Sequence, residues 1–193
     1  MPARVLFCLL LICSPVASSA VDKEVSKTAA QLTQALEQLQ KTSDDPNIQE
    51  RYLEAFPHTY KSFLELFEPD SPLYDGHEYV EALYSLAGRH EVDVGELLVR
   101  LSKDAHYDAD APSYLQHATT TFGGQYTKTF VVLVKKLPFD KQSNLITFLA
   151  DVENHQAYPE YQLVIDHLKG LAERELAHKF EAARAKRSKQ HHG

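Results

Sequence analysis

Sulfur-containing residues and tryptophan are nearly absent from this 193-residue chain. It has no tryptophan, one methionine and two cysteines, and Met1, Cys8 and Cys13 all lie within the first twenty residues. Because the rest of the chain has no thiol, disulfides, thiol catalysis and thiolate metal sites are excluded there. The chain also has no Asn-x-Ser/Thr glycosylation sequence. Both absences favour a bacterial periplasm over an animal secretory pathway.

Motifs of several common catalytic classes are missing as well. The sequence has no HExxH, G-x-S-x-G or G-x-x-x-x-G-K-[ST] pattern, which argues against zinc proteases, α/β-hydrolases and P-loop enzymes. The formal net charge is −7, whereas nucleic-acid-binding proteins carry basic surfaces. We therefore expect neither a familiar enzyme nor a nucleic-acid partner.

The first twenty residues have the pattern of a secretory signal peptide. Arg4 provides a positive charge, residues 5–13 form an apolar run of nine residues, and small residues fill positions 17–20. This pattern predicts cleavage after Ser19 or Ala20, and hence a periplasmic or secreted protein. A bilayer-spanning helix needs about 20 apolar residues, so we expect no transmembrane segment in the mature chain. Lipidation at Cys13 is disfavoured because Ile12 is not the small residue that lipoprotein signals carry there.

Apolar residues recur with helical spacing through most of the mature chain. Positions 25, 29, 32, 36 and 39 share one face and predict a helix over residues 22–41. Asp45 with Pro46 marks the next helix start, and Pro57 disfavours helical geometry at Phe56, where we expect a break. Further starts are predicted at Asp75 with Glu78, Asp93 with Glu96, and Asp110 with Pro112.

The remaining segments also indicate helices. Gly123 and Gly124 are expected to end one of them. Residues 126–137 include a β-rich run, but the flanking pattern is helical and predicts a buried helix. Pro159 opens the last helix, which is predicted to continue to about Arg187. Together these patterns predict an all-α, single-domain multi-helix bundle of eight to nine helices with short loops.

This interpretation divides the chain into three parts. Residues 1–20 form the cleaved signal peptide, residues 21–185 the all-helical domain, and residues 186–193 a basic, disordered tail. From residue 178 onward the basic side chains outnumber the acidic ones, of which Glu181 is the sole example. Such a tail can contact an anionic membrane surface weakly. The alternative is a solvated helix end whose cations suit the helix dipole.

A stretch rich in aromatic residues is the first candidate binding surface. Tyrosine offers both a flat face and a hydroxyl, so such a stretch can line a groove for a sugar, a lipid tail or a peptide. The alternative is that these rings fill the core of a chain without tryptophan. The candidate residues are Tyr60, Phe63, Phe67, Tyr74, Tyr79 and Tyr84.

A polar segment provides the candidate metal site. Asp104, His106, Asp108 and Asp110 lie within seven residues. Carboxylates suit Ca²⁺, and an added imidazole shifts the preference toward Zn²⁺ or Mn²⁺. The alternative is that Asp110 caps a helix and the other side chains are solvated.

These features lead us to expect an exported, non-catalytic helical binding or adaptor protein without a cofactor, whose partner is a protein or a small apolar ligand. One alternative is a metal-dependent hydrolase or metal-binding protein that uses the Asp104–Asp110 segment and histidines with a divalent metal ion. Another is a carrier that holds an apolar small molecule between its helices.

Overall fold

The described part of the chain is entirely helical. The computed structural model describes residues 16–74, 76–106, 111–152 and 159–190, and these contain ten α-helices, one short 3₁₀ helix and no strand. This confirms the predicted all-α single domain, with a count slightly above the expected eight to nine helices. The helices are α1 (Val16–Lys41), α2 (Pro46–Ala55), α3 (Tyr60–Phe67), α4 (His77–Ser85), η1 (Leu86–Gly88), α5 (Glu91–Ser102), α6 (Ala111–Gln125), α7 (Thr127–Lys135), α8 (Phe139–Ala150), α9 (Pro159–Gly170) and α10 (Arg174–Gln190).

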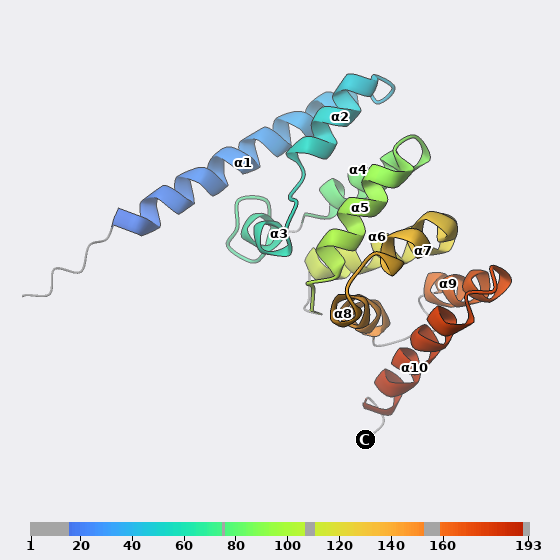
Figure 1. The fold of residues 1–193 in the computed structure, drawn as a ribbon. Helices are drawn as coiled ribbons and strands as arrows, with labels where there is room; N and C mark the ends of the chain where they lie inside the picture. Colours follow the sequence, from blue (N-terminus) through green and yellow to red (C-terminus); the bar gives the residue numbers. More distant parts are fainter. Residues whose placement is uncertain (1–15, 75, 107–110, 153–158, 191–193) are drawn as a thin grey trace, which may run out of the picture.

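The helices are arranged across the molecule roughly in chain order. Figure 1 shows α1 and α2 side by side at one side of the fold and α8–α10 at the other. Between them, α5 packs against α3, α6, α7 and α8. None of the described helices combines the length and hydrophobicity that a membrane-spanning segment requires.

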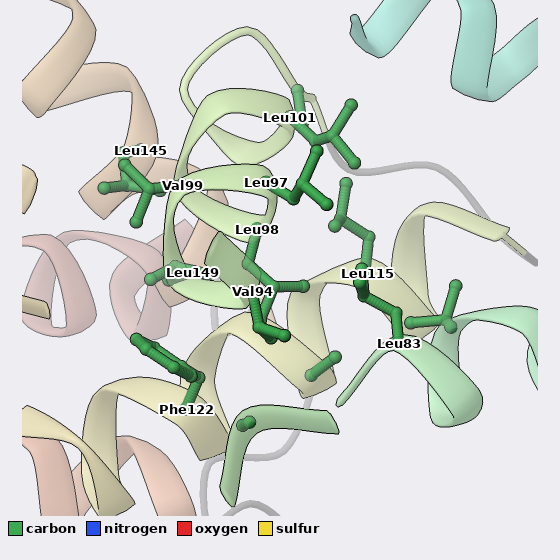
Figure 2. Packing of buried hydrophobic residues seen from close by; sticks show 14 of the residues in the cluster. Leu83, Val94, Leu97, Leu98, Val99, Leu101, Leu115, Phe122, Leu145 and Leu149 are labelled. Atoms are coloured by element: carbon green, nitrogen blue, oxygen red, sulfur yellow. The ribbon is translucent and has the colours of Figure 1, made fainter. Parts of the chain in front are cut away.

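The core is centred on α5. Its buried side chains include Val94, Leu97, Leu98 and Leu101, whose spacing places them along the inward side of the helix. Figure 2 shows these residues among side chains contributed by α4, α6 and α8. Burying apolar side chains of this size contributes about 1.5–3 kcal/mol each, so these residues of α5 contribute to the stability of the fold.

Several helix ends lie where the sequence predicted them. The Asp45 side chain accepts a hydrogen bond from the backbone N–H of Asn47 at 2.9 Å, and Pro46 is the first residue of α2. Phe56 leaves the helical region, with ψ at 144°, directly before Pro57. The β-rich run lies in α7, so residues 127–135 are helical as expected. The predicted cap Asp75 lies outside the described residues.

Two predicted helix ends are wrong. The start at Asp93 is too late, because α5 begins at Glu91 and the backbone N–H of Val94 already donates to the His90 carbonyl at 2.9 Å. The end at Gly123–Gly124 is too early, because α6 continues to Gln125. A Cβ atom on Gly124 would lie 3.1 Å from Leu163 Cδ2 of α9, so this glycine permits close helix packing.

The single helix predicted from Pro159 to about Arg187 is also wrong. It is two helices, α9 and α10, joined at residues 171–173. Ala172 has φ of 60°, in the left-handed region. The N–H of Glu173 donates to the Leu168 carbonyl at 2.9 Å, and the N–H of Ala172 donates to the Lys169 carbonyl at 3.0 Å. These two bonds define a Schellman motif, which ends α9 and reverses the chain.

The C-terminal part assigned to a tail begins within α10. This helix includes residues 186–190, while residues 191–193 lie outside the described part. Arg187 forms an ion pair with Asp151, with 2.5 Å between Nη2 and Oδ1. The cationic end of α10 is therefore held against the segment that follows α8.

Candidate functional site

Most of the predicted aromatic surface lies in the core. Tyr60, Phe63, Phe67 and Tyr79 are each no more than 7% exposed. The ring centroids of Phe63 and Phe67 are 5.0 Å apart, and those of Phe67 and Tyr79 are 5.6 Å apart. Tyr60 packs against Phe63 and His106, and the burial of all four rings leaves little of their surface for a partner.

The other two predicted residues are accessible. Tyr74 belongs to the connection between α3 and α4 and is 54% exposed. Tyr84 is half-buried near the end of α4, and its ring lines a cavity between α4 and α6. Tyr84 is therefore the member of the predicted set that leads to a candidate site.

This cavity, called the α4/α6 groove below, has a volume of about 440 Å³. Helical periodicity explains its lining, because residues three, four and seven apart share a face. Two helices that pack side by side each contribute one such face. The lining residues are His77, Val80, Glu81 and Tyr84 from α4, and Ser113, Tyr114, His117, Ala118 and Thr121 from α6.

One end of the groove is charged and aromatic. His77 Nε2 lies 2.9 Å from Glu81 Oε1, and both side chains are more than half exposed. The His77 ring also contacts Tyr114 with 4.8 Å between ring centroids. Imidazole, carboxylate and phenol thus meet at the solvent-facing rim.

The other end holds two buried hydroxyl groups. Tyr84 and Thr121 each lie seven residues beyond a member of the His77–Tyr114 contact, which is about 10 Å along a helix. Within the described part of the chain, Tyr84 Oη and Thr121 Oγ1 are buried and have no hydrogen-bond partner. Burial raises the pKa of Tyr84, and the nearby Tyr126 phenol adds to this. Tyr84 therefore keeps its proton at neutral pH and can donate a hydrogen bond.

The predicted metal-binding residues are only partly described. Asp108 and Asp110 lie outside the described residues. Asp104 accepts a hydrogen bond from Lys141 Nζ at 2.7 Å, and this bond raises the pKa of Lys141. The His106 ring stands at 78° to the Tyr60 ring, with 5.5 Å between their centroids. Among the described residues, no group of three or more His, Cys, Asp or Glu side chains is placed to hold a metal ion.

A second cavity, between α7 and α9, has polar groups that are already engaged. It encloses about 460 Å³ and is lined in part by Glu91, Thr127 and His167. His167 Nδ1 donates to the Gly124 carbonyl at 2.8 Å, and Thr127 Oγ1 donates to the same oxygen at 3.1 Å. Glu91 accepts a hydrogen bond from the Thr129 hydroxyl. The unpartnered hydroxyls of Tyr84 and Thr121 therefore distinguish the α4/α6 groove from this second cavity.

Sequence reasoning missed most of this groove. His77, Tyr114, His117 and Thr121 carry no recognisable motif, and they come from two helices that are separated in sequence by α5. The i, i+3, i+7 spacing of Tyr114, His117 and Thr121 was the available signal, and it required knowledge of which helices pair. Comparisons of the chain with family models, curated proteins and solved structures gave no match.

Proposed function

We propose that this chain is an exported, non-catalytic helical binding protein that holds a small partner in the α4/α6 groove. The signal-peptide pattern supports export, and the absence of catalytic motifs from the sequence supports binding without chemistry. The groove supplies the binding surface that the aromatic stretch was expected to provide.

The observation that carries the proposal is the pair of unpartnered hydroxyls on Tyr84 and Thr121. A buried polar group without a partner costs about 1–3 kcal/mol, and native proteins retain few of them. Both residues line the same cavity. A bound molecule with hydrogen-bonding groups would recover this free energy, because the described residues provide no hydrogen-bond partner for either hydroxyl.

Phenol is a suitable probe, because it combines a flat ring with one hydroxyl. We expect the purified protein to transfer saturation to phenol protons in an NMR experiment. Tyr114→Ala removes an aromatic wall of the groove and should abolish most of this transfer. Tyr74→Ala removes an exposed tyrosine outside the groove lining and should leave it unchanged.

Circular dichroism provides the control for folding in both variants. Equal saturation transfer in the wild type and in folded Tyr114→Ala would contradict binding in the groove. Absence of transfer from the wild type to phenol and to every other small ring compound tested would contradict the proposal as a whole.

A further inference from the structure

We infer that the ligand of the α4/α6 groove is a neutral saccharide ring, gripped by the Tyr84 and Thr121 hydroxyls at one end and by the Tyr114 ring at the other. This inference rests on the proposed function and adds the chemical class of the ligand. It follows from the size of the groove, the exposure of its ionisable side chains and the chemistry of its unpartnered groups.

The size of the groove fits a small ring. Its volume of about 440 Å³ lies near the lower end of the roughly 300–1,000 Å³ that ligand sites occupy. The lining spans about two helical turns from His77 to Tyr84, or roughly 10 Å. A folded partner domain or a long acyl chain would extend beyond it.

The buried part of the groove favours a neutral molecule. Glu81 and His77 are within 2.9 Å of each other and are more than half exposed at the rim. The buried part of the lining consists of the apolar side chains of Val80 and Ala118 together with the Tyr84 and Thr121 hydroxyls. An anion or a cation placed there would lose its hydration, while the ionisable lining residues His77, Glu81 and His117 are all exposed to solvent.

The unpartnered hydroxyls favour a ligand that is rich in hydroxyl groups. A hydroxyl donates one hydrogen bond and accepts others, so Tyr84 and Thr121 both present these two functions to the same cavity. The hydroxyls of a sugar match both, because each also donates and accepts. A purely apolar ligand would leave both protein groups unsatisfied, which is the arrangement that native proteins avoid.

The aromatic rim completes the match. The ring of Tyr114 faces the groove beside His77. The ring face of a tyrosine provides apolar contact and its hydroxyl provides polar contact. A saccharide ring has apolar C–H faces and a polar edge, so it can pack against Tyr114 while its hydroxyls reach Tyr84 and Thr121.

The test uses ring-shaped probes of similar size that differ in polarity and charge. Glucose, galactose and N-acetylglucosamine are the neutral saccharides, glucuronate is the charged counterpart of glucose, and toluene is the apolar ring. Binding to the purified protein is followed by saturation-transfer NMR and by titration. We expect at least one neutral saccharide to bind, and to bind better than glucuronate and toluene.

Two variants connect binding to the buried hydroxyls. Tyr84→Phe and Thr121→Val each remove one hydroxyl and keep the shape of the side chain. Each should weaken saccharide binding about tenfold, the effect expected for the loss of one well-placed hydrogen bond. Tyr74→Phe is the matched control, because it removes the hydroxyl of an exposed tyrosine outside the groove lining, and it should leave binding unchanged.

The outcomes separate this inference from the proposed function. Binding of phenol or toluene without any saccharide would overturn the inference and leave the groove as a binding site. Equal binding of glucose and glucuronate would overturn the requirement for a neutral ligand and hence the inference. Failure of every probe, phenol included, would overturn both.

Discussion

At the scale of single residues, some buried tyrosines join helices through hydroxyl hydrogen bonds, whereas Tyr84 does not. The Tyr52 hydroxyl of α2 donates to the Tyr79 carbonyl of α4 at 2.6 Å. The Tyr161 hydroxyl of α9 donates to the Phe180 carbonyl of α10 at 2.8 Å. Tyr84 makes no such bond within the described residues. The same functional group therefore joins helices in two places and has no hydrogen-bond partner among the described residues in a third.

This division predicts opposite effects of removing the hydroxyl. Tyr52→Phe should lower the free energy of unfolding by about 1 kcal/mol, because it deletes a buried hydrogen bond. Tyr84→Phe should leave the free energy of unfolding unchanged or raise it, since the lost hydroxyl had no partner. Urea denaturation of the unliganded protein measures both. A loss for Tyr84→Phe as large as that for Tyr52→Phe would mean that the hydroxyl is already satisfied, and it would remove the basis of the proposed site.

At the scale of helices, the side-chain cap that begins α2 is visible in the sequence, while the backbone motif that ends α9 is not. Asp45 with Pro46 was recognised because both residues act locally. The reversal between α9 and α10 depends on Ala172 in the left-handed region, where glycine is the usual residue. Gly170, two residues earlier, lies inside α9. The break was missed because the residue that makes it has no intrinsic preference for that conformation.

The conformation of Ala172 provides a prediction at this scale. A left-handed backbone costs an L-residue roughly 1–2 kcal/mol, while glycine loses about 0.5–1 kcal/mol more than alanine through chain entropy. Ala172→Gly should therefore raise the free energy of unfolding by up to about 1 kcal/mol. Ala182→Gly, at an exposed position inside α10, should lower it by about 1 kcal/mol. Thermal unfolding of the two variants measures this contrast, and equal losses would show that Ala172 is unstrained.

At the scale of the whole molecule, the helical spacing of apolar residues predicts the fold class. It does not predict which helices pack against each other. The seam that includes Leu32, Leu36 and Leu39 defined α1 because burial along one helix is a local pattern. The contact of α4 with α6 depends on how α5 places its neighbours in the core. Tyr84 could be singled out as an aromatic residue, but its partner Thr121 could not. The candidate site results from the packing of α4 against α6, and the spacing of residues along the sequence does not reveal that packing.

Two buried tyrosines are expected to make the whole fold less stable as the pH rises into the alkaline range. Burial raises the pKa of Tyr52 well above the ordinary tyrosine value of 10.0, and the nearby Tyr79 and Glu78 add to this effect. Burial likewise raises the pKa of Tyr161, although Arg184 opposes it. Below pH 10 both phenols are protonated in the folded and unfolded states, so their contribution to stability is fully present.

Above pH 10 the unfolded chain releases protons that the folded protein retains. The free energy of unfolding should then fall by roughly 1.4 kcal/mol per pH unit for each of the two tyrosines. Urea denaturation followed by circular dichroism between pH 8 and pH 12 measures the slope, and absorbance of tyrosinate shows when the phenols ionise. We expect Tyr52→Phe to reduce the slope, because one of the two linked protons is gone. Ionisation of every tyrosine near pH 10 with the helical signal intact would contradict this, since it would mean that Tyr52 and Tyr161 lose their protons without unfolding.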